Sequence, residues 1–106
     1  MVKILLVDDH ELVRSGIRLI LERVAGFVVV AEAKSGEDAI RYCRKDAPDI
    51  VLMDVSMPGI GGLEATKQIE RMSENTRVIC LSMHSENPIP AKVMQMGAFG
   101  FITKDA

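Results

Sequence analysis

The sequence predicts an α/β fold in which helices cover both faces of a five-stranded parallel sheet. Five short apolar runs recur along the 106 residues, and segments with helical periodicity separate them. The runs also lack the polar alternation of strands that face water on one side. Regular alternation of strands and helices is typical of an open sheet wound with right-handed crossovers.

The predicted strands are rich in β-branched and other apolar residues, which suits strands buried on both faces. They are Ile4–Val7, Phe27–Ala31, Ile50–Met53, Val78–Leu81 and Ala98–Ile102. In a parallel sheet all strands end at the same edge, and ligand sites form there. The polar residues that follow these runs are therefore the first candidates for a functional site.

The clearest predicted helix is Glu11–Val24. At helical spacing its apolar residues share one face, which we expect to pack against the sheet. This inner face comprises Val13, Ile17, Ile20, Leu21 and Val24, and the outer face comprises Arg14, Arg18, Glu22 and Arg23. The helix is therefore predicted to turn its arginines toward solvent.

Three further helices complete the predicted alternation. Ser35 is expected to cap the start of the second helix, because Asp38 follows three residues later, and Pro48 helps to end it. The third helix is expected at Leu63–Met72 and the fourth at about Pro88–Met96. The chain stops soon after the last strand, before the place where a fifth helix would cover it.

Length and charge limit the function classes. With 106 residues, the chain is predicted to be one domain, residues 1–106, without a fifth helix. An apolar face left uncovered beside the first helix would make the chain weakly stable or self-associating.

The net charge of −2 gives no broad basic surface for DNA, and no apolar run could span a bilayer. We expect a cytoplasmic protein in which Cys43 and Cys80 are buried, reduced thiols.

Acidic residues follow two of the predicted strands. Asp8 and Asp9 follow the first run and Asp54 follows the third, so we expect these carboxylates at one edge. Their mutual repulsion favours a cation, and Mg²⁺ prefers such oxygen ligands. A carboxylate beside a metal ion can accept a phosphoryl group. The sequence thus predicts a phosphoacceptor site at Asp54, with Ser82 and Lys104 placed to contact the phosphoryl group.

Each of these residues also has a simpler interpretation. Asp54 could be a turn residue, and Asp8 or Asp9 could cap the first helix. His10 and His84 are expected to be surface or capping residues, because no acid–base partner is placed beside either in the sequence. The convergence of several polar strand ends favours the functional interpretation.

Three motifs resemble those of the receiver domains of two-component response regulators. Leu6–His10 is similar to the acidic-pair motif of this family, Val51–Gly59 to its phosphoacceptor motif and Phe101–Lys104 to its lysine motif. The resemblance covers essentially the whole chain. Segments His10–Ile17 and Ser85–Lys92 look like the helix-turn-helix-output branch, nearest to GacA/UvrY-type regulators. The resemblance implies a flavodoxin-like (CheY-like) fold with strand order 2-1-3-4-5.

The resemblance also implies a role for each site residue. Asp54 would be phosphorylated and would contact Mg²⁺, Asp9 would bind the ion directly, and Asp8 would act largely through metal-bound water. The main-chain carbonyl of Ser56 would be a further ligand. The switch and phosphate-binding residues would be Ser82, Phe101 and Lys104. Such a domain catalyses only its own phosphorylation and dephosphorylation.

The partners that the resemblance implies are a sensor histidine kinase, a second copy of the chain in a homodimer, and DNA through an output domain not in this chain. Two other classes fit less well. A haloacid dehalogenase-like phosphohydrolase needs a second Asp two residues after the nucleophile, where this chain has Ser56. A flavodoxin-like cofactor carrier needs a phosphate loop after the first strand, where Asp8 and Asp9 would repel phosphate. We therefore expect a phosphorylation switch that controls output, most simply transcription.

Overall fold

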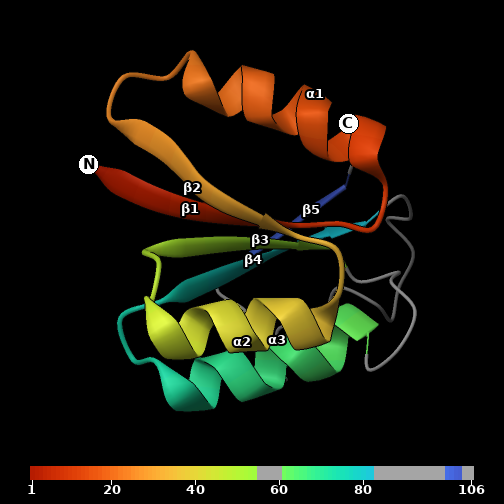
Figure 1. Ribbon diagram of the computed structural model, residues 1–106, viewed down its shortest axis with the longest axis vertical. Helices are drawn as coiled ribbons and strands as arrows, with labels where there is room; N and C mark the ends of the chain where they lie inside the picture. Colours follow the sequence, from red (N-terminus) through yellow and green to blue (C-terminus); the bar gives the residue numbers. More distant parts are fainter. Residues whose placement is uncertain (55–60, 83–99, 104–106) are drawn as a thin grey trace.

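The computed structural model describes residues 1–54, 61–82 and 100–103. Within them, five parallel strands form one sheet in the order β2-β1-β3-β4-β5. Figure 1 shows α1 on one face of this sheet and α2 and α3 on the other. The strands are β1 (Val2–Val7), β2 (Phe27–Ala33), β3 (Ile50–Asp54), β4 (Arg77–Ser82) and β5 (Gly100–Thr103), and the helices are α1 (Glu11–Glu22), α2 (Gly36–Lys45) and α3 (Gly61–Met72).

This architecture confirms the predicted flavodoxin-like fold and its strand order. The strand β2 is two residues longer than expected, because Glu32 and Ala33 continue to pair with Leu6 and Val7 of β1. The extension places Glu32 within the edge strand rather than in a loop. The expected fourth helix, Pro88–Met96, lies outside the residues that the structure describes.

The core forms two layers because successive side chains of each strand point to opposite faces. In β1, Leu5 and Val7 join a cluster with residues of α2 and α3, whereas Ile4 and Leu6 join a second cluster packed against α1. All four side chains are buried. A parallel sheet buried on both faces explains why the strands read as unbroken apolar runs.

The helix α1 packs against the sheet through Ile17 and Leu21. Two residues of its predicted inner face are instead exposed, Ile20 at 65% and Val24 at 44%. Val24 lies beyond the last helical residue, in a turn where its N–H bonds to the Leu21 carbonyl. Arg14, predicted to face solvent, is only 7% exposed. The helix is thus rotated so that an arginine, not Ile20, points toward the sheet.

The start of α2 forms as predicted. Ser35 is the N-cap, and its side chain accepts a hydrogen bond of 3.1 Å from the main-chain N–H of Asp38. Glu37 and Asp38 lie in the first turn and Arg44 and Lys45 in the last, which favours the helix dipole at both ends. None of the helices in the described part of the chain has the length and apolar character needed to cross a membrane.

Candidate functional site

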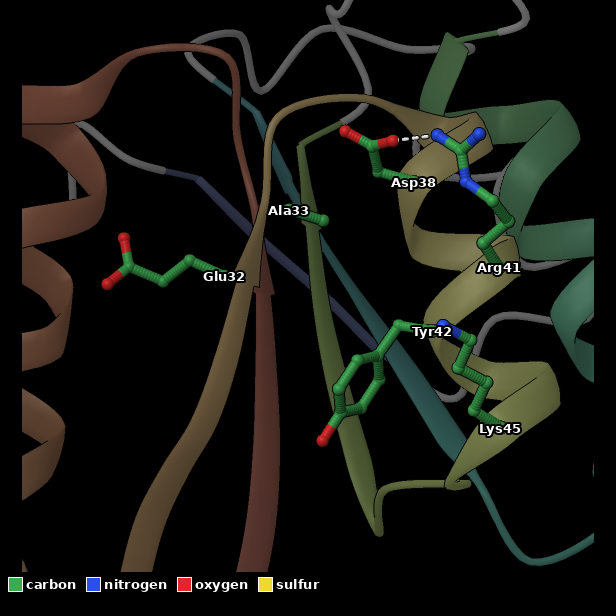
Figure 2. A pocket seen from close by; sticks show the side chains of 6 residues that line it. All are labelled: Glu32, Ala33, Asp38, Arg41, Tyr42 and Lys45. Carbon is green, nitrogen blue, oxygen red and sulfur yellow. Dashed lines mark hydrogen bonds and ion pairs between the residues drawn. The ribbon is translucent and has the colours of Figure 1, made fainter.

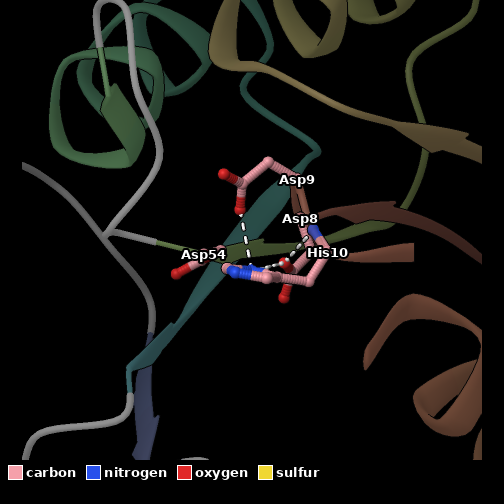
Figure 3. Close-up of side chains that lie close together, drawn as sticks. All are labelled: Asp8, Asp9, His10 and Asp54. Atoms are coloured by element: carbon pink, nitrogen blue, oxygen red, sulfur yellow. Dashed lines mark hydrogen bonds and ion pairs between the residues drawn. The ribbon is translucent and has the colours of Figure 1, made fainter. Parts of the chain in front are cut away.

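The carboxyl ends of β1 and β3 bring four side chains together (Figure 3). They are Asp8, Asp9, His10 and Asp54, and each offers a ligand atom within 4.8 Å of the others. The register of the sheet explains the contact, because Val7 of β1 lies opposite Met53 of β3. The residues that follow these two therefore meet at the edge. The predicted convergence of the three aspartates is confirmed.

Burial differs sharply within this acidic cluster. Asp8 and Asp54 are 2% and 1% exposed, whereas the side chain of Asp9 is 29% exposed and that of His10 67%. The two buried carboxylates form the floor of the cluster, and Asp9 and His10 form its open side. Of the four residues, Asp9 and His10 are therefore the two that solvent reaches.

Asp8 is held in place by groups from β2, from α1 and from the nearby residue His10. Its main-chain N–H donates to the Ala33 carbonyl of β2 at 3.1 Å, and its carbonyl accepts from Nη1 of Arg14 in α1 at 2.6 Å. Its side-chain Oδ1 accepts from the main-chain N–H of His10 at 2.8 Å. Both the main chain and the carboxylate of Asp8 thus have a fixed direction.

His10 contacts the acidic pair, which the sequence analysis did not predict. It occupies the N-cap position of α1 but makes no side-chain capping hydrogen bond. Instead its Nδ1 lies 2.9 Å from Oδ1 of Asp9 and 3.2 Å from Oδ1 of Asp8. The adjacency of His10 to the acidic pair was the available signal. His10 is exposed and stands at the N-cap position, as expected, but the expectation that it has no acid–base partner was wrong.

The other predicted site residues are placed only in part. Ser82 ends β4 and lies opposite Thr103 of β5, and Phe101 of β5 lies opposite Cys80 of β4. Ser82 thus belongs to the strand that pairs with β3, and Phe101 belongs to the next strand beyond it. Ser56 and Lys104 fall outside the residues that the structure describes.

The chemistry of the acidic cluster suits a hard divalent cation. The carboxylates of Asp8, Asp9 and Asp54 supply oxygen atoms, which Mg²⁺ prefers, and their negative charges need compensation. The imidazole nitrogen of His10 is a better ligand for softer ions such as Zn²⁺ or Ni²⁺ than for Mg²⁺. The residues present therefore fit a Mg²⁺ site in which His10 is not needed as a ligand.

A shallow pocket of about 270 Å³ lies elsewhere, between β2 and α2 (Figure 2). Arg41 and Asp38 form an ion pair at its rim. Burial raises the pKa of the Tyr42 hydroxyl, which also lines it. Among the described residues, the group of side chains that could hold a metal ion lies at the acidic cluster and not in this pocket, so the acidic cluster is the stronger candidate site.

Curated proteins of similar sequence are response regulators. UvrY of Escherichia coli K12 is 60% identical over 106 residues, which are all of this chain and 49% of UvrY. GacA of Pseudomonas aeruginosa PAO1 is 48% identical over 106 residues, which make up 50% of GacA. The chain therefore spans about half the length of these relatives.

Solved structures agree with this relationship. A two-component response regulator of the LuxR family from Aurantimonas sp. SI85-9A1 matches with a TM-score of 0.94 and 42% identity, over 98% of this chain and 74% of that one. The CheX–CheY–BeF₃–Mg²⁺ complex from Borrelia burgdorferi matches with a TM-score of 0.89 and 28% identity, over 97% of this chain and 78% of that one.

A family model described as the response regulator receiver domain matches residues 4–106. The resemblance that the three sequence motifs carry is thereby confirmed. Receiver domains of this family bind Mg²⁺ at an acidic pocket and are phosphorylated on aspartate. Fold, site and sequence agree, and the chain belongs to the response regulator receiver domain family, as a receiver domain of the UvrY/GacA type.

Proposed function

We propose that the chain is a phosphorylation switch that accepts a phosphoryl group on Asp54 from a sensor histidine kinase. The observation that carries this proposal is the position of Asp54, buried at the end of β3 with the carboxylates of Asp8 and Asp9 beside it. One oxygen of Asp54 forms the new P–O bond while the P–N bond of the kinase phosphohistidine breaks. The released imidazole takes up a proton.

The proposed direct Mg²⁺ ligands are the carboxylates of Asp9 and Asp54 and the main-chain carbonyl of Ser56, and Asp8 would complete the metal site largely through water bound to the ion. Mg²⁺, when bound, neutralises charge on the transferred phosphoryl group. The protein positions these ligands: Asp8 is buried and held by hydrogen bonds, Asp54 is buried beside it, and the carboxylate of Asp9 is partly exposed. The chain would catalyse only its own phosphorylation and dephosphorylation.

Ser82, Phe101 and Lys104 are proposed to read out the new charge. Ser82 and Phe101 belong to β4 and β5, the strands beyond β3, so a change at Asp54 is transmitted across that side of the sheet. Lys104 directly follows β5 and would pair with the phosphoryl group.

Output is proposed to reside in a separate DNA-binding domain. The UvrY and GacA relatives are about twice as long as this chain, which leaves room in them for an output domain, and we propose that such a domain controls transcription by binding DNA. We also propose a cytoplasmic location and a homodimer. The homodimer is supported by the exposed apolar side chains of α1, namely Leu12, Leu19 and Ile20.

Intact-mass measurement after incubation with acetyl phosphate and Mg²⁺ tests the phosphoacceptor. The native chain should gain the mass of one phosphoryl group, and EDTA should prevent this gain. Asp54→Ala should abolish it, whereas Asp46→Asn, at the exposed end of α2, should label like the native chain. Undiminished labelling of Asp54→Ala would sink the assignment.

A further inference from the structure

Arg14 is a buried cation that joins three elements of the fold. It projects from α1 and is 7% exposed. Its Nη1 donates to the main-chain carbonyl of Asp8 at 2.6 Å, and its Nε donates to Oε1 of Glu32 at 2.8 Å. One side chain therefore links the helix to the end of β1 and to the edge strand β2.

The Asp8 carbonyl that Arg14 contacts belongs to the peptide group between Asp8 and Asp9. On the other side of Asp8, the main-chain N–H is bonded to the Ala33 carbonyl. A peptide group is planar, so fixing its carbonyl also fixes the direction in which Asp9 leaves it. The hydrogen bond from Arg14 thus fixes the peptide group that joins Asp8 and Asp9, from whose two ends the neighbouring carboxylates of the acidic cluster project.

Glu32 compensates the charge of Arg14 and shares it with Arg18. Its Oε2 accepts from Nη1 of Arg18 at 2.6 Å, while its Oε1 is bonded to Arg14. Figure 2 shows the Glu32 side chain leaving β2 on the side opposite to Asp38 and Arg41, toward α1. Because a carboxylate neutralises the Arg14 guanidinium locally, the main effect of Arg14 on the acidic cluster is geometric.

Arg18 provides a natural comparison for Arg14. Both arginines come from α1 and bind the same carboxylate of Glu32, but the side chain of Arg18 is 44% exposed and its second partner is Glu22. Of the two, only Arg14 has a hydrogen bond to the main chain of the acidic cluster in the described structure. A property that depends on this hydrogen bond should separate the two residues.

We propose that Arg14 is a positioning residue for the divalent cation, acting through the peptide group between Asp8 and Asp9. This inference rests on the proposed use of the acidic cluster as a Mg²⁺ site. Residues that orient metal ligands without touching the ion typically change metal affinity by about 10–100-fold when they are replaced. Arg14→Met should therefore weaken Mg²⁺ binding about tenfold, at the lower end of that range.

The test is a titration of Mg²⁺ into the native chain and three variants by isothermal calorimetry. Arg14→Met should show the weaker binding, and the matched control Arg18→Met should bind within about twofold of the native chain, because an exposed ion pair contributes little. In Arg14→Lys the ammonium group can reach one acceptor but lacks the two donors of the guanidinium. The Mg²⁺ affinity of this variant should therefore fall between those of Arg14→Met and the native chain.

A second measurement separates positioning from a general loss of stability. The melting temperature of each variant is measured with and without Mg²⁺. The difference between these two temperatures is the rise caused by the ion, and this rise is then compared between the variants and the native chain. Loss of stability alone lowers both temperatures together, whereas loss of positioning reduces the rise. With acetyl phosphate, the labelling rate of Arg14→Met should recover at saturating Mg²⁺.

Equal Mg²⁺ affinities for Arg14→Met and Arg18→Met would overturn the role of Arg14 while leaving the proposed function intact. A native chain that shows neither calorimetric binding nor a change in melting temperature with Mg²⁺ would overturn the metal site itself, and the inference with it. Labelling of Asp54 that fails in the native chain despite tight Mg²⁺ binding would contradict only the phosphoacceptor role.

Discussion

The Nδ1 atom of His10 lies 2.9 Å from Oδ1 of Asp9, on the open side of an otherwise buried acidic cluster. Mg²⁺ prefers oxygen ligands, so an incoming ion must replace this contact. We predict that His10→Ala strengthens Mg²⁺ binding. The gain should be at most about fivefold, because a pair between exposed partners is worth up to about 1 kcal/mol. Calorimetric titration measures it.

The same variant should weaken binding of Ni²⁺ or Zn²⁺, since it removes the imidazole ligand that these ions prefer. His10→Ala keeps the main-chain N–H that bonds to Asp8, so the floor of the cluster is preserved. Parallel weakening for Mg²⁺ and Ni²⁺ would instead mean that His10 supports the whole site.

The sequence predicted the features that depend on local pattern. Buried strands appear as apolar runs, and Asp54 follows one of them directly, so the edge of the sheet could be located in advance. The contact of His10 with the acidic pair could have been predicted from its adjacency to Asp9, whereas the surroundings of Arg14 could not. Arg14 is buried because Glu32 continues β2 beyond its predicted end and faces α1, a tertiary contact that helical periodicity does not contain. The helical pattern assigned the charged Arg14 to the surface, but a guanidinium whose donors are hydrogen-bonded can be buried in the protein.

Hydrogen bonds from Arg14 and then from Arg18 lower the pKa of Glu32 below its ordinary value of 4.5. Because the pKa of Glu32 is lower in the folded state than in the unfolded state, ionised Glu32 stabilises the fold at pH values above its unfolded pKa. This contribution is lost as the pH falls through the folded pKa. We predict that Glu32→Gln lowers the melting temperature at pH 7 and that its difference from the native chain disappears below the folded pKa. Melting curves from pH 7 to pH 3 check this. A pH-independent difference would contradict it.

Burial raises the pKa of the Cys43 thiol and of the Cys80 thiol to about 11 in each case. Both are free and buried, as the sequence predicted. We predict that neither thiol reacts with a thiol-specific chromogenic disulfide at pH 8 while the chain is folded. Little thiolate is present at this pH, and burial keeps the disulfide reagent away from both sulfur atoms. Two equivalents should react in urea. Rapid reaction of one equivalent without urea would show that its helix or strand opens locally.

Thr76 closes the turn between α3 and β4. It is fully buried, and its Oγ1 donates to the Pro48 carbonyl at 2.7 Å. Thr76→Val keeps the shape but leaves this carbonyl without its donor, which should cost about 1–3 kcal/mol of unfolding free energy. Ser73, whose Oγ contacts the same hydroxyl, is the control. Ser73→Ala should cost less, because the bond to Pro48 survives. Urea denaturation of both variants measures the difference, and equal losses would contradict it.

The exposed side of α1 carries large apolar side chains. Leu12 is 87% exposed and Leu19 63%, whereas Ile17 of the same helix packs on the sheet. Contact between such surfaces in two copies removes apolar area from water. We predict that the chain self-associates and that Leu19→Lys reduces this association in sedimentation equilibrium.

An exposed substitution away from the core typically changes the free energy of unfolding by about 0.5 kcal/mol or less. Leu19→Lys should therefore unfold in urea much like the native chain when both are dilute. Ile17→Ala is the contrasting variant. Because Ile17 packs against the buried cluster beneath α1, shortening it should lower the unfolding free energy, by up to about 2 kcal/mol for a partly buried residue. If Leu19→Lys associates as strongly as the native chain, α1 is not the contact surface, and the homodimer must use another part of the domain.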